Sequence, residues 1–174
     1  MTVPQIQKPE TMRFGYGETA LGLIVVATSQ DGVAALFIGE DRARLRRDLQ
    51  QAFPQAAFIL DQADLADTIA KATILIDAPH QPSGLVLDLR GSPLELAVWR
   101  ALQAIPSGET RTYGALARTL PVQATAQEVG AACAANRIAV AVPCHRVVKA
   151  DGSISGYRWG VYRKRRLINM EGVA

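Results

Sequence analysis

The stretch DAPHQPSGLVLDLRGSPLELAVWRALQAI, residues 77–105, marks a change of character in this chain of 174 residues. Its beginning, residues 77–84, combines two prolines and a glycine with polar side chains, a composition typical of a linker. Its end, residues 93–105, repeats apolar side chains at helical spacing. We therefore expect one domain over residues 1–84 and a second over residues 85–174.

Upstream of the linker, the sequence predicts a small α/β domain. Residues 12–40 hold short β-rich runs separated by glycine-containing turns, which indicates an antiparallel sheet. Residues 41–53 begin with Asp41, a good helix cap, and place apolar side chains at every fourth position, so they predict an amphipathic helix. A short strand at 56–60 and a second helix at 65–76 follow. No catalytic constellation occurs here, and we assign this domain a supporting role.

Downstream of the linker, the pattern becomes mainly helical. Residues 85–89, LVLDL, predict one strand before the helix at 93–105. Two shorter helices are predicted at 112–120 and 124–136, with a proline between them. Two short helices across a tight turn outline a helix-turn-helix, and an αα-hairpin that only packs fits the same pattern.

Charge is divided unequally along the chain. Residues 1–90 hold 8 Lys/Arg against 11 Asp/Glu, a net charge of −3, whereas residues 91–174 hold 11 against 5, a net charge of +6. This asymmetry indicates a polyanionic partner for the second half. No apolar run approaches the roughly 18 residues of a membrane span, so we expect a cytoplasmic protein with no membrane partner.

Cysteine and histidine are scarce: the chain has only Cys133, Cys144, His80 and His145. They form no CxxC pair and cannot complete a four-ligand zinc site without carboxylates, so we expect no metal and no cofactor. We expect Cys133, in an alanine-rich helix, to be a small core residue and His80, in the linker, to be exposed and inert. For Cys144 two roles remain: a packed core residue or a reactive thiol.

Cys144 lies in AVPCHRVV, residues 141–148, directly after a proline that restricts the backbone. His145 can accept a proton, and the cations Arg146 and Lys149 would favour the thiolate over the thiol. A lone cysteine beside a histidine is more often structural than catalytic. Context decides between the two interpretations.

Two distant residues supply that context. Glu171, near the C-terminus, could orient the imidazole, and Tyr113 could donate a proton from the first helix of the possible helix-turn-helix. Cys144, His145 and Glu171 would then form the kind of constellation that activates a nucleophile. Spacing alone does not bring them together.

At this point the sequence resembles a known family, the methylated-DNA–protein-cysteine methyltransferases, also called O6-alkylguanine-DNA alkyltransferases. The resemblance is carried by PCHRV, IPSGETRTYGALA, AACAAN, GSISGYRWG and LINMEG, in the order of the family. The forms CAANR and SGYRWG are closest to the Ada branch of that family. The resemblance implies an α+β fold: a small N-terminal α/β domain of ribonuclease H-like type, followed by a mostly helical domain with a helix-turn-helix.

The resemblance also implies a reaction: one irreversible transfer of the alkyl group from O6-methylguanine in DNA to Cys144, with O4-methylthymine as a further candidate substrate. His145 would take the thiol proton through a water, and Glu171 would orient His145. Asn136 would brace the active-site turn through hydrogen bonds. Tyr113 would help turn the nucleotide out of the duplex and protonate the departing guanine.

Further residues are assigned to substrate binding by the same resemblance. The main chain at Cys144 and Val147 would accept from the guanine amino group, and the Arg158 amide would donate to O6. Tyr157 would form part of the pocket wall, and we count Arg146 among the substrate-binding residues.

Double-stranded DNA, bound through its minor groove, is the expected partner. The predicted helix at 124–136 has little side-chain bulk, and a helix of that kind approaches a groove closely. In place of the usual arginine that fills the gap left by the flipped base, this chain has Gln127, beside an acidic Glu128. We expect weaker DNA affinity or slower repair than in an arginine-bearing relative. The residues expected to touch DNA are Ala126, Gln127, Gly130 and Ala131.

Two alternatives remain open. A regulator that binds alkylated bases without efficient transfer would use the same fold, and a hydrolytic Cys–His enzyme would turn over repeatedly. We interpret the charge run RKRR, residues 163–166, as a solvated helix face, with phosphate contact as the alternative. Trp99 and Trp159 are expected in the core, and the protein is expected to be a monomer.

Overall fold

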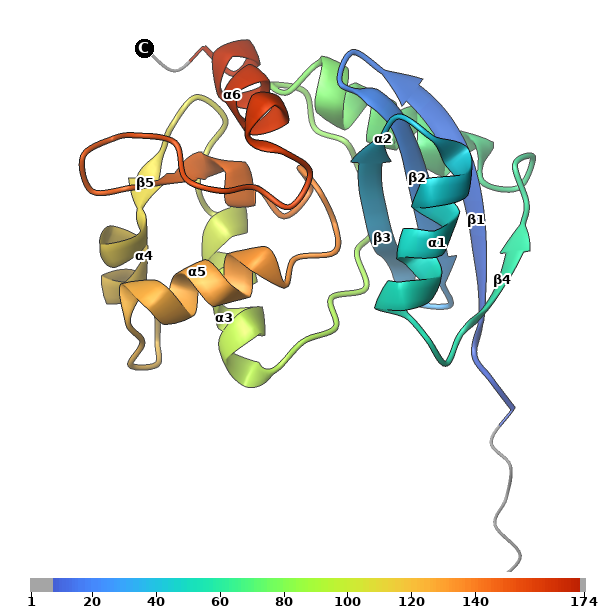
Figure 1. The fold of residues 1–174 in the computed structure, drawn as a ribbon, viewed down its shortest axis with the longest axis horizontal. Coiled ribbons are helices and arrows are strands. Elements are labelled where there is room, and N and C mark those ends of the chain that lie inside the picture. Colours follow the sequence, from blue (N-terminus) through green and yellow to red (C-terminus); the bar gives the residue numbers. More distant parts are fainter. Residues whose placement is uncertain (1–7, 173–174) are drawn as a thin grey trace, which may run out of the picture.

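A four-stranded sheet forms the first half of the molecule. The computed structural model describes residues 8–172 (Figure 1). Three strands, β1 (Thr11–Thr19), β2 (Gly22–Ser29) and β3 (Gly32–Gly39), pair antiparallel, and β4 (Ala57–Leu60) adds to β1 in parallel, giving the order β3-β2-β1-β4. The predicted antiparallel sheet and the strand at 56–60 are confirmed.

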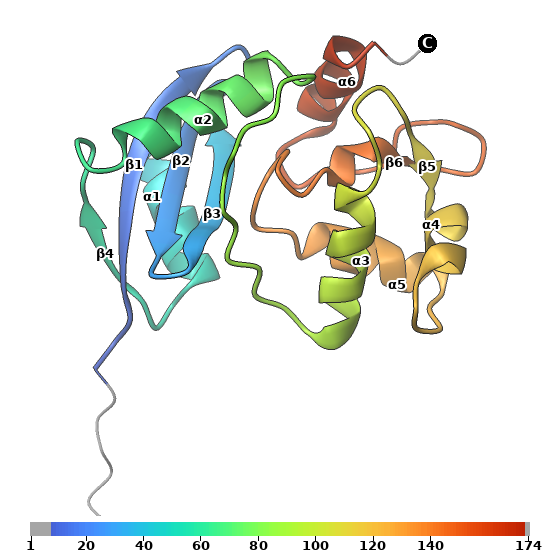
Figure 2. The same cartoon turned by 180° about the vertical axis from the view of Figure 1, so that it is seen from behind.

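Two helices cover opposite faces of this sheet (Figures 1 and 2). Helix α1 (Arg42–Ala52) begins at Asp41, whose carboxylate accepts from the Arg44 amide at 2.7 Å, and it packs on β2 and β3. Helix α2 (Ala66–Asp77) packs on β1, where a side chain at Gly15 or Gly17 would collide with Ile69. Both helices agree with the sequence pattern.

The segment between α2 and the next helix contains no strand, so the prediction of a strand at 85–89 is wrong. Leu87 forms only an isolated parallel bridge with Val33 of β3. Three residues further along the same edge, Leu36 bonds instead with Arg137 and Ala139 of a later segment. Because two segments share one short edge, neither has room to continue as a strand. Figure 2 shows the first of them crossing between the sheet and the helical half.

The second half is built from four helices around a short parallel pair. Helix α3 (Pro93–Gln103) begins with a capping box in which Ser92 and Glu95 bond reciprocally. Strand β5 (Arg111–Thr112) leads into α4 (Tyr113–Thr119), and α5 (Ala126–Ala134) follows after a short loop. A single 3-10 turn (Cys144–Arg146) enters β6 (Val147–Val148), which pairs with β5, and α6 (Val161–Met170) comes last. The predicted helices are present.

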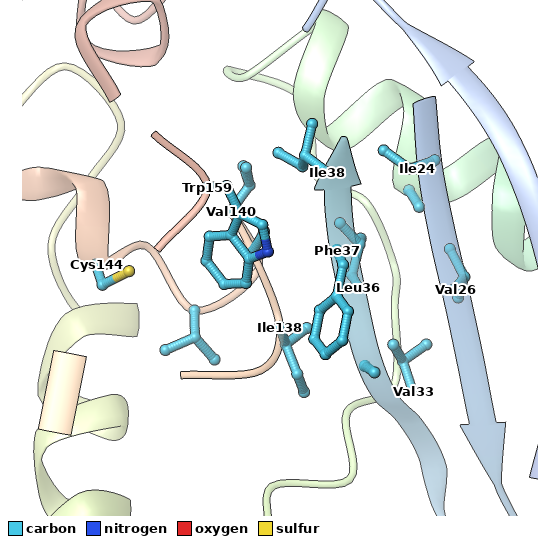
Figure 3. Close-up of a cluster of buried hydrophobic side chains, with 14 of the residues drawn as sticks. Ile24, Val26, Val33, Leu36, Phe37, Ile38, Ile138, Val140, Cys144 and Trp159 are labelled. Atoms are coloured by element: carbon cyan, nitrogen blue, oxygen red, sulfur yellow. The ribbon is translucent and has the colours of Figure 1, made fainter. Parts of the chain in front are cut away.

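One continuous hydrophobic core joins the two halves. Figure 3 shows it passing from Ile24 and Leu36 of the sheet, through Ile138 and Trp159, to Cys144. The α+β class is therefore confirmed, and Cys144 lies at the end of a packed core. None of the helices within residues 8–172 is long and apolar enough to span a membrane.

A candidate active site around Cys144

A sharply folded loop delivers Cys144. After the bridge to β3, the chain reverses at Val140, whose φ of 66° is unfavourable for a β-branched residue. The Ala141 amide donates to the Ala139 carbonyl at 2.7 Å, and the Cys144 amide donates to the Val142 carbonyl at 2.8 Å. Two consecutive tight turns thus fix the backbone that presents the thiol.

Asn136 holds this loop together through three hydrogen bonds. It is 1% exposed, and its Nδ2 donates to the Val142 carbonyl at 2.8 Å and to Cys144 Sγ at 3.3 Å. Its Oδ1 accepts from the Ile138 amide at 2.9 Å. One buried amide therefore connects the start of the loop, its end and the sulfur.

The thiol opens into a pocket of about 310 Å³. The walls come from α4, α5 and the loop before α6, so residues far apart in the sequence meet there. The lining residues are Tyr113, Gly130, Cys133, Ala134, Cys144, Gly156, Tyr157 and Arg158. Tyr113, Tyr157 and Arg158 are thus near Cys144, as the sequence predicted. The volume lies at the small end of the range of small-molecule sites.

His145 and Glu171 form a buried pair, with Nε2 and Oε1 2.7 Å apart. Burial works against the carboxylate, but hydrogen bonds from His145 and Arg146 outweigh it and hold the pKa of Glu171 at about 2. Burial lowers the pKa of His145, so the ring is neutral at neutral pH. With Nε2–H donated to Glu171, Nδ1 is an acceptor, and it has no hydrogen-bond partner within residues 8–172.

The charges near the thiol differ from those expected. Arg146 is buried, donates to both Glu171 oxygens and to the Ile105 carbonyl, and does not line the pocket. Lys149 is exposed. Burial raises the pKa of the Cys144 thiol, opposed by the Asn136 hydrogen bond and by the charges of Lys164 and Arg158. The prediction that Arg146 and Lys149 stabilise the thiolate is wrong, because the 3-10 turn directs Arg146 towards Glu171.

Tyr113 begins α4 and is half-buried. Its hydroxyl is hydrogen-bonded to Ser155, and burial raises its pKa, so it is a protonated phenol at neutral pH. Gly130 of α5 lies beside its ring, where an added Cβ would be 3.8 Å away. Tyr113 therefore faces the same pocket as the thiol and still carries its proton.

The opposite wall is formed by the loop before α6. Tyr157 stacks edge-on against Trp159, with ring centroids 5.3 Å apart. The Arg158 guanidinium lies over the Phe37 ring and donates to the Asn136 carbonyl at 2.9 Å. Trp159 is buried, as expected for a core residue.

The outward face of α5 carries mainly small side chains. Ala126, Gln127 and Ala131 are exposed on it, and Gly130 continues it to the mouth of the pocket. The Glu128 carboxylate accepts from the Thr125 amide at 2.7 Å, completing a capping box. Its charge is therefore placed at the positive end of the helix, where it is stabilised. Val147, which was assigned to substrate binding, lies in β6 and does not line the pocket.

Lys164 and Ser155 were missed by the sequence analysis. Lys164 is 1% exposed and donates to the Val147 carbonyl at 2.6 Å and to Ser155 Oγ at 3.0 Å. The interpretation of residues 163–166 as a solvated face is wrong for it. A signal was present, since Lys164 shares an i, i+3, i+4, i+7 spacing with Leu167, Ile168 and Glu171, all of which are buried.

The chain is similar to DNA-repair methyltransferases. A family model described as "6-O-methylguanine DNA methyltransferase, DNA binding domain" matches residues 93–173. The "Bifunctional transcriptional activator/DNA repair enzyme Ada" of Escherichia coli is 40% identical over 92% of this chain and 45% of its own length. The inducible "Methylated-DNA--protein-cysteine methyltransferase" of Bacillus subtilis is 32% identical over 91% of this chain and 83% of its own length.

Similarity extends to solved structures. The crystal structure of Mycobacterium tuberculosis OGT in complex with DNA matches with a TM-score of 0.76 and 30% identity, over 91% of this chain and 92% of that one. The O6-methylguanine-DNA methyltransferase of Pyrococcus kodakaraensis matches with a TM-score of 0.74 and 25% identity, over 93% and 99% of the two chains. The chain spans about half the length of the Ada proteins it matches.

Proposed function

The chain belongs to the family of methylated-DNA–protein-cysteine methyltransferases, and from this we propose that it removes the alkyl group from O6-methylguanine in DNA and retains it on Cys144. The observation that carries the proposal is a buried thiol, opening into a pocket of about 310 Å³, with a His–Glu pair behind it and a phenol in the wall. These are the parts that a single alkyl transfer needs.

The reaction begins with a neutral thiol, because burial disfavours the thiolate. His145 takes the thiol proton at Nδ1 through a water while Glu171 stabilises the resulting imidazolium. The sulfur attacks the alkyl carbon, the S–C bond forms and the C–O6 bond breaks. The electron pair of that bond passes to guanine, which takes the Tyr113 proton. The thioether that remains is stable, so each chain reacts once.

We assign the substrate contacts to this pocket and to strand β6. The main-chain carbonyls of Cys144 and Val147 accept from the guanine amino group, and the Arg158 amide donates to O6. The Val147 carbonyl already accepts from Lys164, and a carbonyl has a second lone pair for the base. Tyr157 packs against the base. Arg146 acts at a distance, by holding Glu171 in place.

DNA binding is assigned to α4 and α5, which we propose form a helix-turn-helix whose second helix enters the minor groove. The exposed small residues of α5 permit close approach, and the basic second half attracts phosphates. The base must leave the stack to reach Cys144, at a cost of a few kcal/mol that is lower for a weakly paired lesion. Gln127 fills the gap without adding charge.

The N-terminal half, with a boundary after residue 84, is assigned a supporting role. Its two helices on opposite sheet faces fit a ribonuclease H-like domain, and we propose that label for it. A cytoplasmic location and a monomeric state complete the proposal.

Intact-protein mass spectrometry tests this function. The protein is incubated with a duplex carrying one O6-methylguanine, beside the variants Cys144→Ser and Cys133→Ser. We expect one added methyl group per chain in the wild type and in Cys133→Ser, and none in Cys144→Ser. Binding without any change of mass would overturn the proposal in favour of a lesion-binding regulator, and repeated turnover would point to a hydrolase.

A further inference from the structure

Lys164 is a buried cation close to the Tyr113 ring, and its charge also acts on Cys144. Its ammonium lies 6.0 Å from the centre of the Tyr113 ring, and its charge opposes the burial effect at Cys144. None of the salt bridges in the described part of the chain pairs it with a carboxylate; its partners there are the Val147 carbonyl and the Ser155 hydroxyl. An unpaired buried ammonium is costly, and its surroundings favour an anion beside it.

One of the two hydrogen bonds to the Ser155 oxygen has a defined direction. An ammonium can only donate, so one lone pair of the Ser155 oxygen is taken by Lys164. Within residues 8–172, the remaining partner of Ser155 Oγ is Tyr113 Oη. When the serine hydroxyl donates to the tyrosine oxygen, the hydrogen of Tyr113 itself is free to point into the pocket.

We propose that Lys164 and Ser155 are positioning residues that prepare Tyr113 as the proton donor of the alkyl transfer. The inference rests on the function proposed above and deepens it. Ser155 directs the phenol hydrogen towards the base and stabilises the phenolate that forms when the proton leaves. Lys164 fixes the orientation of Ser155 and supplies the positive charge that faces the phenolate.

The charge balance agrees with this role. The thiol proton moves to His145, the S–C bond forms, the C–O6 bond breaks, and the Tyr113 proton moves to guanine. The protein then holds an imidazolium and a phenolate, so its net charge is unchanged. As the thiol proton leaves, the charge of Lys164 favours the developing thiolate, and in the product it faces the phenolate. A fixed cation near both needs no reorganisation during the reaction.

A double-mutant cycle between Ser155 and Tyr113 tests the proposal. The single-turnover rate constant for methyl transfer from O6-methylguanine duplex is measured for the wild type, Ser155→Ala, Tyr113→Phe and the double variant. In the background that retains Tyr113, we expect Ser155→Ala to lower the rate constant about tenfold, the effect of one lost hydrogen bond. In the Tyr113→Phe background the same change should have less than about a twofold effect, because no proton remains to direct.

Matched variants separate this role from a structural one. Ser155→Thr keeps the hydroxyl and should restore most of the rate. Ser153→Ala removes a hydroxyl of the same loop whose partner within the described residues is Asp151, so this variant should leave the rate unchanged. Lys164→Met should slow transfer, and Lys164→Arg should recover part of the rate, with folding of both followed by urea unfolding.

The outcomes discriminate between the two proposals. Suppose that the wild type transfers the methyl group, but that Ser155→Ala lowers the rate constant by the same factor in the wild-type and Tyr113→Phe backgrounds, or in neither. Lys164 and Ser155 then do not act through Tyr113. A wild type that transfers no methyl group would overturn the proposed function and this inference with it.

Discussion

Replacing Glu171 by glutamine tests the buried charge network through stability alone. The Glu171 carboxylate is 2% exposed and accepts hydrogen bonds from His145 at 2.7 Å and from Arg146 at 2.8 Å. These bonds hold its pKa at about 2, against a usual value of 4.5. A difference of roughly 2.5 units, at about 1.4 kcal/mol per unit, corresponds to roughly 3 kcal/mol of folding stability.

The sign follows from the lowered pKa. The unfolded chain binds the proton first as the pH falls, so the contribution is complete above about pH 5 and is lost as the pH falls from 4.5 to about 2. Glu171→Gln lacks this contribution, and its Arg146 guanidinium is buried without a counter-charge. We expect the variant to be less stable by roughly 3 kcal/mol at pH 7, with the gap closing towards pH 2.

Urea unfolding of both proteins from pH 7 to pH 2 measures this gap directly. Glu109→Gln is the control, since Glu109 is an exposed carboxylate that bonds with Arg111, and its curve should follow the wild type. A gap between wild type and Glu171→Gln that stays constant down to pH 2 would refute the reasoning. The lost stability would then come from packing rather than from an ionised carboxylate.

Three further predictions concern DNA binding, packing and thiol reactivity. Gln127→Arg should tighten DNA binding and steepen the dependence of log K on log salt concentration by about 0.9. The control Gln55→Arg, in the N-terminal half, should change neither. Equal affinity of wild type and Gln127→Arg at matched salt would contradict this prediction. Gly91→Ala should cost about 1–3 kcal/mol in urea unfolding, because its Cβ would lie 2.7 Å from an indole ring. Burial raises the pKa of Cys133 to about 12, so folded Cys144→Ser should resist iodoacetamide at pH 7 and the unfolded variant should take up one label by mass spectrometry.

Most helices could be predicted because their determinants are local. The side chain of Asp41 caps α1, and Leu45 and Leu49 repeat at helical spacing on its buried face. Local determinants could not decide whether residues 85–89 form a strand. Their β propensity is real, but a ladder also needs a free partner edge, and Leu36 on that edge is bonded to Arg137 and Ala139, about fifty positions after the expected strand.

The site was predicted through its motifs, and the errors came from reading sequence neighbours as spatial neighbours. Arg146 follows Cys144 by two residues, yet a 3-10 turn directs its side chain to Glu171. Lys164 is twenty residues away from Cys144, and its charge nevertheless acts on the thiol. Only the tertiary fold brings such a cation near the sulfur.

Helix α6 connects the two ends of the proposed reaction. Lys164 lies within it and Glu171 directly follows it, seven residues later, so the two side chains are about 10 Å apart along the axis. In the proposed reaction Lys164 positions the proton donor, Tyr113, and Glu171 orients the base, His145. Arg163 donates to the Leu21 carbonyl at 2.8 Å, and Arg166 donates to the Ala20 carbonyl at 2.8 Å, in the turn between β1 and β2. The turn between β1 and β2 is therefore bonded to the helix that carries Lys164, which agrees with the supporting role proposed for the N-terminal half.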